Sequence, residues 1–264
     1  MSQAIFCKTR YQDIGYHSYN DMWNMVAWAG YPVIYVDQID AQSDNTYIVT
    51  PLNDEWLHGW QSPKARIIHY ELEWRWDWRA DVNEPPGVAE VWAADKWYAE
   101  KIGARYVPMG GDSRLNEIGS QFPTTKVFDV ALLSYQTHRR QVVTKSLLDE
   151  GLRLAPIDNL WGNRRSANLM QSRLMVHVHQ NDNTPGIAPL RWCLAAAHKL
   201  PLITEIVNDG GIFKPGTMMQ SEYQYMAGFT NAMLKSNLLD EYAITLHELL
   251  CNEYTFAKGI ESHV

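Results

Sequence analysis

The sequence is poor in cysteine and has no long apolar run. Its three cysteines, Cys7, Cys193 and Cys251, lie far apart, so no pair has the spacing of a zinc site or of a disulfide framework. No stretch reaches the roughly 18 apolar residues of a membrane span, and the start of the sequence lacks the pattern of a secretory signal. The sequence therefore predicts a cytoplasmic protein without a membrane span.

Positive charge is also scarce. The 23 Lys and Arg residues against 30 Asp and Glu residues give a formal net charge of -7 at pH 7. This balance excludes a surface that binds nucleic acid everywhere, although it permits a local basic groove. What the sequence does contain is 46% apolar and 12% aromatic residues in a chain of 264, which is enough to bury a sizeable core.

Short apolar runs alternate with segments of helical period along the chain, a pattern typical of parallel α/β sheets. One such series covers residues 1–110 and a second covers residues 126–236. Residues 111–125 contain Gly and Pro and predict a linker, whereas residues 237–264 predict a C-terminal helix that packs back toward the first lobe. The predicted fold is α/β, with two Rossmann-like lobes facing a cleft where the carboxyl ends of the strands bind ligands.

Candidate ligand-binding residues follow the expected strands of the second lobe. His177 and His179 alternate along one strand and so point the same way. Either imidazole can donate to a phosphate or be hydrogen-bonded within the core. Arg191 falls in the first turns of the next helix, where a guanidinium and backbone amides suit a diphosphate, and a solvated arginine is the alternative. Glu205 closes a strand and can accept from ribose hydroxyls or cap a helix.

The order of these motifs resembles a known enzyme family. The segments WG, RR, SRLMVHVH, PGIAPLRWCLAAAHKLPLITE and FKPG, within residues 127–216, are similar to the donor-binding lobe of family 1 glycosyltransferases with two Rossmann lobes (GT-B). The likeness is strongest to the spore-maturation subgroup, and a weaker one runs through EVWAADKWYAEKIGARYVPMGGD in the first lobe. The resemblance implies a nucleoside-diphosphate sugar as donor and sugar transfer to an acceptor hydroxyl.

The resemblance implies which residues hold the diphosphate of the donor. His179 and Arg191 match family positions that face the two phosphates. Arg139 or Arg140, after the first strand of this lobe, is expected near the same phosphates.

Recognition of the nucleoside is implied less fully. Trp161 and Gly162 match positions that line the base. The sequence departs from the family at Leu194, where a ribose-binding glutamate is usual, and at His177, where an asparagine is usual. Ribose recognition must then differ, and Glu205 is the candidate for it.

The first lobe offers candidates for the catalytic base. An inverting sugar transfer needs a carboxylate or imidazole that removes a proton from the acceptor hydroxyl. Two loops after expected strands carry such groups, and a solvated acidic loop is the alternative for each of them. The candidates are Asp13, His17, Glu71 and Asp77.

The resemblance, together with these residues, implies a hexosyltransferase whose expected donor is a UDP-sugar such as UDP-glucose. Arginines and helix amino ends can stabilise the leaving diphosphate, so no obligatory metal is expected. A hydroxymethylated DNA base, as in a bacteriophage DNA-modification enzyme acting in host cytoplasm, is one acceptor, and a polysaccharide, a protein or a metabolite is equally compatible. A nucleotide-binding module without catalysis and a nucleotide-sugar epimerase are the alternatives. The sequence is compatible with a monomer or a homodimer.

Overall fold

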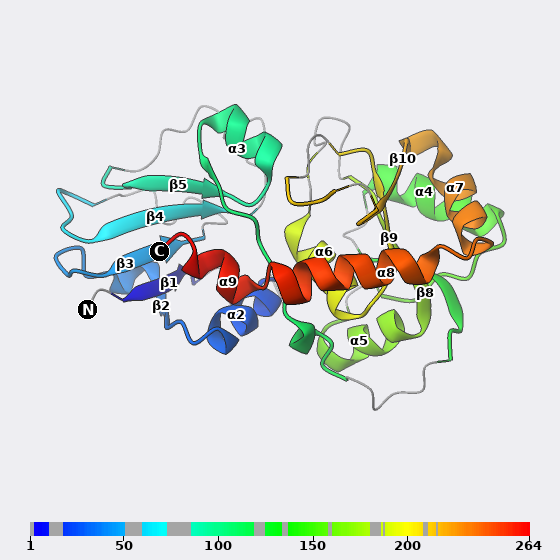
Figure 1. The fold of residues 1–264 in the computed structure, drawn as a ribbon, viewed down its shortest axis with the longest axis horizontal. Helices are drawn as coiled ribbons and strands as arrows, with labels where there is room; N and C mark the ends of the chain where they lie inside the picture. Colours follow the sequence, from blue (N-terminus) through cyan, green and yellow to red (C-terminus); the bar gives the residue numbers. More distant parts are fainter. Residues whose placement is uncertain are drawn as a thin grey trace. The chain divides into compact units, whose positions relative to one another are not determined.

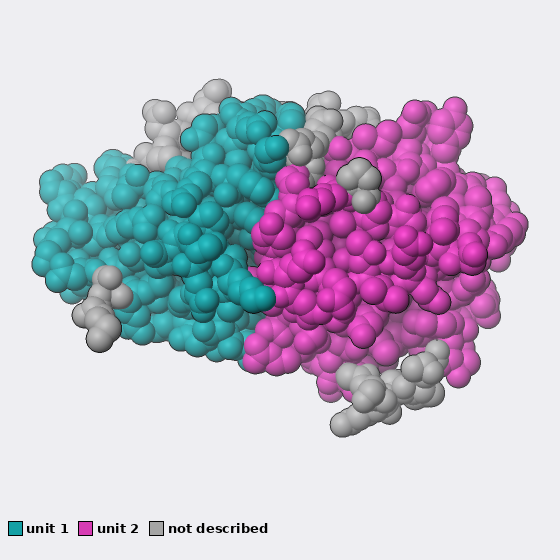
Figure 2. Space-filling view, in the orientation of Figure 1, with its two compact units in different colours: residues 1–109, 256–264 teal, residues 110–255 magenta. Residues whose placement is uncertain are grey.

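The computed structural model divides the chain into two compact units (Figure 2). Unit 1 comprises residues 1–109 and 256–264, and unit 2 comprises residues 110–255. The segment expected as a linker therefore belongs to unit 2, and the expected C-terminal segment divides between the units after Thr255. The structure describes residues 3–10, 18–50, 60–72, 86–118, 125–133, 137–157, 160–179, 186, 188–207, 211–214 and 216–264.

Unit 1 is built on a parallel sheet whose described strands follow the order β2-β1-β3-β4-β5-β6 (Figure 1). The register aligns Cys7 of β1 with Val49 of β3, and Val49 with His69 of β4. Residues aligned in this way share one face of the sheet, so the apolar ones form a common core. The strands are β1 (Ala4–Lys8), β2 (Val33–Tyr35), β3 (Thr46–Val49), β4 (Arg66–Glu71), β5 (Glu90–Ala93) and β6 (Arg105–Tyr106).

Helices cover the opposite face of this sheet. Phe6 of β1 points to that face, and its ring lies 5.8 Å from the ring of Phe256, centroid to centroid. Phe256 begins α9 (Phe256–Glu261), which contacts α2 (Ser18–Trp28). The last residues of the chain thereby complete the core of the first unit.

Local sequence sets the ends of α3 (Lys96–Ile102), which contacts β5 and β6. The side chain of Asp95 accepts a hydrogen bond from the backbone N–H of Tyr98 at 2.7 Å, which satisfies one of the free amides at the start of the helix. Gly103 ends the helix in the left-handed conformation, at φ 69°, which glycine adopts without a steric penalty.

Unit 2 contains a second parallel sheet, in the order β10-β9-β8-β7 among its described strands. Val130 of β7, Val176 of β8 and Ile203 of β9 point to one face, together with residues of two helices. Figure 1 shows these helices, α4 and α7, side by side, and they contact each other. The strands are β7 (Phe128–Leu132), β8 (Ser172–His177), β9 (Leu202–Glu205) and β10 (Met219–Ser221); the helices are α4 (His138–Asp149), α5 (Gly162–Met170), α6 (Pro189–Ala197), α7 (Met226–Leu234) and α8 (Leu239–His247).

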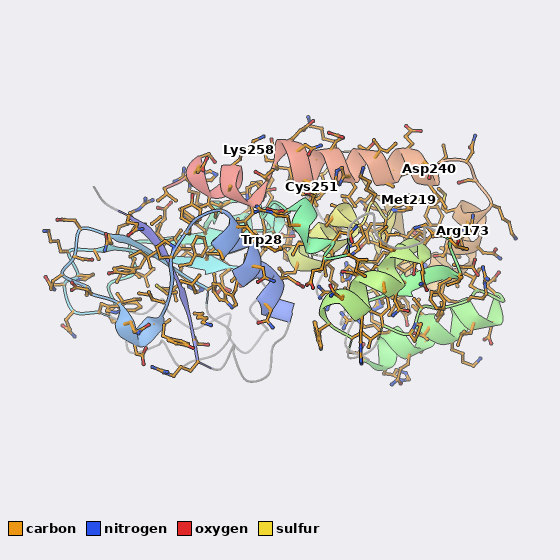
Figure 3. The ribbon with its side chains drawn as sticks, turned by 90° about the horizontal axis from the view of Figure 1, so that it is seen from below. Trp28, Arg173, Met219, Asp240, Cys251 and Lys258 are labelled. Carbon is orange, nitrogen blue, oxygen red and sulfur yellow. The ribbon has the colours of Figure 1, made fainter. Side chains whose placement is uncertain are left out.

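The second face of this sheet is buried as well. Ala131 and Met175, which alternate with the residues named above and so point to this second face, are inaccessible to solvent. Helix α5 contacts β8, and α6 contacts α8. Arg173, labelled in Figure 3, ties the start of β8 to the end of α7, since its Nη2 donates to the carbonyl oxygen of Leu234 at 2.6 Å. Burial on both faces explains why the strands are continuous apolar runs.

Three local features depart from a regular series of strands and helices. Residues 152–155 join the sheet through an isolated bridge between Val130 and Leu154. The edge strand β10 has only three residues, and Gln220 at its centre is exposed. Helix α8 is followed directly by a π-helical segment, Glu248–Glu253. No helix in the described part of the chain is long and apolar enough to cross a membrane.

A buried histidine in unit 2 predicts a pH-dependent stability. The ring of His198 bonds the carbonyl oxygen of Leu194 through Nδ1 at 2.8 Å and the hydroxyl of Ser166 through Nε2 at 2.9 Å. Burial lowers the pKa of His198 to about 4, from an ordinary value near 6.5. Between these pH values the unfolded chain binds a proton that the folded chain does not, so stability falls as the pH drops from 6.5 toward 4.

We expect His198→Gln to remove this part of the pH dependence. Between pH 7 and pH 5 the free energy of unfolding of the natural protein should fall by about 2 kcal/mol more than that of the variant. Urea unfolding at the two pH values measures the difference, and exposed His138→Gln is the matched control. Equal pH dependence in the His198→Gln variant and the natural protein would show that His198 is not buried in its neutral form.

Candidate functional site

The carboxyl edge of the unit 2 sheet brings the predicted donor-binding residues to one end of the fold. His177 ends β8, and Glu205 ends the adjacent strand β9. Arg139 and Arg140 lie in the first turn of α4, which follows β7, and Arg191 lies in the first turn of α6, which follows β8. Because the sheet is parallel, all these elements meet at the edge where ligands of such sheets bind. We call His177, His179, Arg139, Arg140, Arg191 and Glu205 the arginine cluster.

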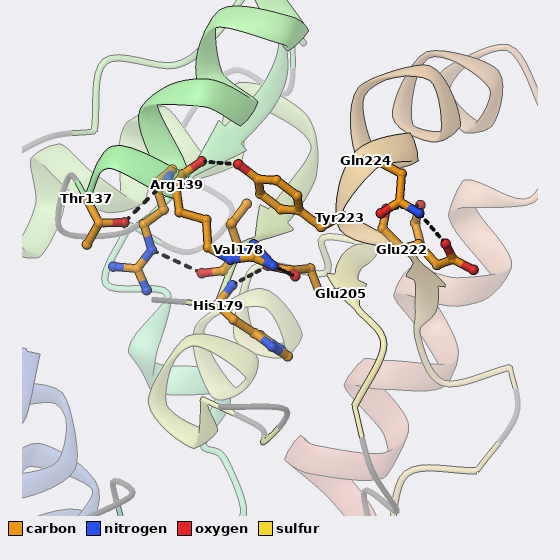
Figure 4. Close-up of polar contacts among 10 residues, drawn as sticks. Thr137, Arg139, Val178, His179, Glu205, Glu222, Tyr223 and Gln224 are labelled. Carbon is orange, nitrogen blue, oxygen red and sulfur yellow. Dashed lines mark hydrogen bonds and ion pairs between the residues drawn. The ribbon is translucent and has the colours of Figure 1, made fainter. Parts of the chain in front are cut away.

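The carboxylate of Glu205 connects two other members of the arginine cluster (Figure 4). One carboxylate oxygen, Oε1, accepts from the backbone N–H of His179 at 2.7 Å, and the other accepts from the guanidinium of Arg139. The carboxylate is buried, with 7% of the side chain exposed. A buried ion pair of this kind needs additional hydrogen bonds to offset the loss of hydration, and the amide of His179 provides one.

Tyr223 holds Arg139 from another side. The guanidinium carbon of Arg139 lies 3.7 Å from the centroid of the Tyr223 ring, and the Tyr223 hydroxyl donates to the carbonyl oxygen of Arg139 at 3.0 Å. Figure 4 shows the ring beside Arg139, opposite Thr137, which caps the start of α4. Arg139 is therefore fixed by an ion pair and by a cation–π contact.

The other two arginines attach to β8 and the residues after it. Nε of Arg140 donates to the carbonyl oxygen of Val178 at 3.0 Å, and Nη1 of Arg191 lies 3.4 Å from Nδ1 of His177. Burial and the positive charge of Arg191 lower the pKa of the Arg140 guanidinium to about 9, against the opposing effect of Glu205. Arg140 is therefore still charged at pH 7, close to another positive charge.

Both histidines of the cluster are neutral at pH 7. Burial, then the charges of Arg139, Arg140 and Arg191, lower the pKa of His179 to about 4. Burial and the neighbouring charges also lower the pKa of His177 well below its ordinary value. The same positive potential that disfavours protonation of these rings favours the binding of an anion.

His179 completes the cluster with a polar atom that the described residues leave unpaired. Its side chain is buried, and its Nε2 has no hydrogen-bond partner among the residues that the structure describes. Its ring centroid lies 5.5 Å from that of His177, so the two imidazoles lie on the same side of the chain, as the alternation in the sequence predicted. A buried ring nitrogen without a partner is costly, and a ligand oxygen at this position would satisfy it.

Trp161 and Gly162 lie at the start of α5, at the same edge of the fold. The Trp161 ring is 40% exposed and lies 5.7 Å from the guanidinium carbon of Arg165. Gly162 adopts φ 56°, and a Cβ atom there would lie 3.3 Å from Oε2 of Glu117. The arrangement leaves part of Trp161 accessible to solvent.

The departures from the family pattern are visible in the structure. Leu194 is buried within α6, with 3% exposed, and its carbonyl oxygen bonds the ring of His198. Glu205, the alternative ribose ligand, has both oxygens engaged with Arg139 and His179. The Glu205 carboxylate therefore binds two groups of the protein itself, which the sequence alone did not indicate.

In unit 1, one predicted catalytic residue has a described environment. Glu71 ends β4 with 6% exposed, and its Oε1 lies 3.0 Å from Nε2 of the fully buried His69. The two residues alternate along β4, so they point to the same face of the sheet. A carboxylate is one of the groups that can act as a general base, so Glu71 stays a candidate for that role. Asp13, His17 and Asp77 lie outside the described residues.

The sequence analysis did not identify two residues beside the candidate site residues, Tyr223 in unit 2 and His69 in unit 1. Tyr223 lies 84 residues from Arg139 in the chain, and no local sequence pattern links them. His69 precedes Glu71 by two positions, a spacing that signals a shared strand face, and this signal was available in the sequence.

The fold resembles that of several solved structures. T4 phage β-glucosyltransferase matches over 99% of this chain and 97% of its own, with a TM-score of 0.52 and 14% identity. TarM matches over 86% of this chain with a TM-score of 0.56 and 11% identity, and this match spans 55% of the length of TarM. The N-terminal domain of Candida albicans trehalose-6-phosphate phosphatase matches 92% of this chain and 74% of its own, with a TM-score of 0.57 and 11% identity.

At these identities the likeness concerns the fold. It confirms the predicted α/β class with two Rossmann-like units and the resemblance to GT-B glycosyltransferases. No protein-family model matches the sequence, and no curated protein matches it.

We expect Glu205→Ala to destabilise unit 2 strongly. The variant leaves the Arg139 guanidinium and the His179 amide without their buried acceptor, which should lower the free energy of unfolding by about 3 kcal/mol. Glu205→Gln keeps an oxygen for the amide and should lose less. Urea unfolding measures both, and Glu222→Ala, at an exposed neighbour that bonds Gln224, is the control with a change under about 0.5 kcal/mol. If Glu205→Ala were as stable as the control, the contacts of Glu205 with Arg139 and His179 would not stabilise the fold.

Proposed function

We propose that the protein is a glycosyltransferase that binds a nucleoside-diphosphate sugar at the arginine cluster of unit 2. The observation that carries this proposal is the charge of the cluster. Three guanidiniums converge on the carboxyl edge of the sheet, and the cluster contains one carboxylate, Glu205. A diphosphate supplies the negative charge that such a group of residues would bind.

The same residues suit the chemistry of the leaving group. When the bond between the sugar and the diphosphate breaks, negative charge builds up on the phosphate oxygen that leaves. Fixed guanidiniums and the amino ends of α4 and α6 stabilise that charge without needing to reorganise. Arg191 is partly exposed in the first turn of α6, so we propose that it contacts the diphosphate directly.

A UDP-sugar is the proposed donor, and a hydroxyl group is the proposed acceptor. The T4 phage enzyme, described as a DNA-modifying β-glucosyltransferase with uridine diphosphoglucose as substrate, supports this choice because it shares the fold over nearly its whole length. Trp161 is proposed to stack on the base. A hydroxymethylated DNA base is the proposed acceptor, and Glu71, Asp13, His17 and Asp77 remain the candidates for the base that deprotonates it.

We expect Arg191→Ala to weaken UDP binding by about 1.5 to 3 kcal/mol, or roughly 10- to 150-fold, because a charge-assisted contact to phosphate is lost. Isothermal titration with UDP measures this change. Arg191→Lys should recover part of the affinity, since it keeps the charge but not the planar fork. Arg164→Ala, at an exposed residue of α5, is the control. An unchanged affinity of Arg191→Ala for UDP would show that the arginine cluster is not the donor site.

We also expect sugar transfer to proceed in the presence of EDTA. Incubation with UDP-glucose and DNA containing 5-hydroxymethylcytosine should add one hexose per modified base, detected by mass spectrometry, and unmodified DNA is the control. Activity that disappears with EDTA and returns with Mn²⁺ would contradict charge stabilisation by arginines alone.

The same incubation separates the alternative functions. Release of an altered sugar without any acceptor would indicate an epimerase. Binding of UDP without turnover, over acceptors that include polysaccharides and proteins, would indicate a nucleotide-binding module.

A further inference from the structure

The imidazole of His179 is buried within the arginine cluster, and one of its nitrogens is unpaired. Only 6% of the residue is exposed, and Nε2 has no hydrogen-bond partner in the described part of the chain. The backbone N–H of His179 donates to Glu205 at 2.7 Å, and the ring centroid lies 5.5 Å from that of His177. The ring is thus held in place, while Nε2 lacks the partner that a buried nitrogen needs.

The charged and titratable groups around this ring come from four elements. They are Arg139 and Arg140 from α4, Arg191 from α6, His177 from β8 and Glu205 from β9. The carboxylate of Glu205 pairs with Arg139. Burial, then the charges of the three arginines, lower the pKa of His179 to about 4. Without a ligand, the ring is therefore neutral at pH 7 and largely neutral at pH 5.

A diphosphate at the cluster changes this balance. Each phosphate of a nucleotide sugar is negatively charged and esterified on both sides, so the ligand itself does not titrate between pH 5 and pH 8. An anion close to a titratable ring favours the charged form of the ring and raises its pKa, by about one to three units. The protonated ring in turn offers the phosphate a charge-assisted hydrogen bond, which is roughly twice as strong as a neutral one.

We propose that His179 takes up a proton when the diphosphate of the donor binds, and that its Nε2–H then donates to a phosphate oxygen. The proton comes from solvent and returns to solvent when the diphosphate is released. The inference rests on the proposed function, because it requires a diphosphate at the arginine cluster. It adds to the site a cationic ring that exists only in the complex, and it couples donor binding to pH.

The direction of this coupling follows from the two pKa values of the ring. A proton is taken up where the pH lies between the pKa of the free protein and the higher pKa of the complex. Affinity for the donor therefore rises as the pH falls through the pKa of the complex. For a rise from about 4 to about 6, UDP-glucose should bind about tenfold more tightly at pH 5 than at pH 8.

The direct test counts the protons that accompany binding. Isothermal titration with UDP-glucose, repeated in two buffers of different ionisation enthalpy, measures this number. We expect uptake of about 0.4 to 0.9 of a proton at pH 5 and of about 0.1 or less at pH 8. Uridine, which has no phosphate, should bind without proton uptake.

Two glutamine variants assign the proton to one ring. His179→Gln should bind UDP-glucose without proton uptake and with nearly the same affinity at pH 5 and pH 8, because an amide does not titrate. His138→Gln, at an exposed histidine in the first turn of α4, is the matched control and should keep the uptake. Uptake that persists in His179→Gln, or disappears in His138→Gln, would assign the proton to another group and overturn the inference.

The variant Arg191→Ala separates this inference from the proposed function. If it weakens UDP-glucose binding while the natural protein takes up no proton at pH 5, the role of His179 is overturned and the proposed donor site stands. If Arg191→Ala binds UDP-glucose as tightly as the natural protein, the proposed donor site itself fails.

A measurement on the natural protein does not depend on the folding of any variant. Nitrogen-15 NMR of labelled histidine follows the protonation of each ring. We expect His179 to titrate near pH 4 in the free protein and about one to three pH units higher with UDP-glucose bound. His198, which has a pKa of about 4 and lies outside the cluster, should titrate at the same pH in both states. A His179 ring that titrates at the same pH with and without UDP-glucose would overturn the inference.

Discussion

The carboxylate of Glu205 holds together the edge of the sheet on which the candidate site depends. It joins the end of β9 to the backbone of His179 after β8 and to Arg139 at the start of α4. These three segments come from separate crossovers of the parallel sheet. One buried anion thus fixes the relative positions of elements that sequence separates by as many as 66 residues. Because the anion has a cation and an amide as partners, its burial is compensated.

With Glu205 committed to structure, the rest of the arginine cluster is strongly positive. The nearby rings are neutral, since burial and the charges of the neighbouring guanidiniums both lower the pKa values of His177 and His179. The guanidiniums create a positive potential at this edge, which an anionic ligand can use. Preorganisation of this kind is the main way in which proteins stabilise charge that develops during a reaction.

The carboxyl edge of the unit 1 sheet has a different chemistry. There a buried carboxylate and a buried imidazole, those of Glu71 and His69, lie with 3.0 Å between their nearest atoms. Such a pair suits proton transfer, whereas the arginine cluster suits the binding of phosphates. The two units thus present different buried groups at the carboxyl ends of their strands.

The sequence by itself determined the sheets and most helices, because period and capping are local. Asp95 and Gly103 mark the two ends of α3, and the apolar run over β8 requires burial on both faces. The sequence also placed Arg191 and His179 at an edge, since strand ends are visible in the pattern. Only the tertiary structure decided that Glu205 binds Arg139, that Tyr223 covers Arg139, and that His177 contacts Arg191. These contacts join residues from different crossovers, and their partners are set by packing across the sheet, which no local period encodes.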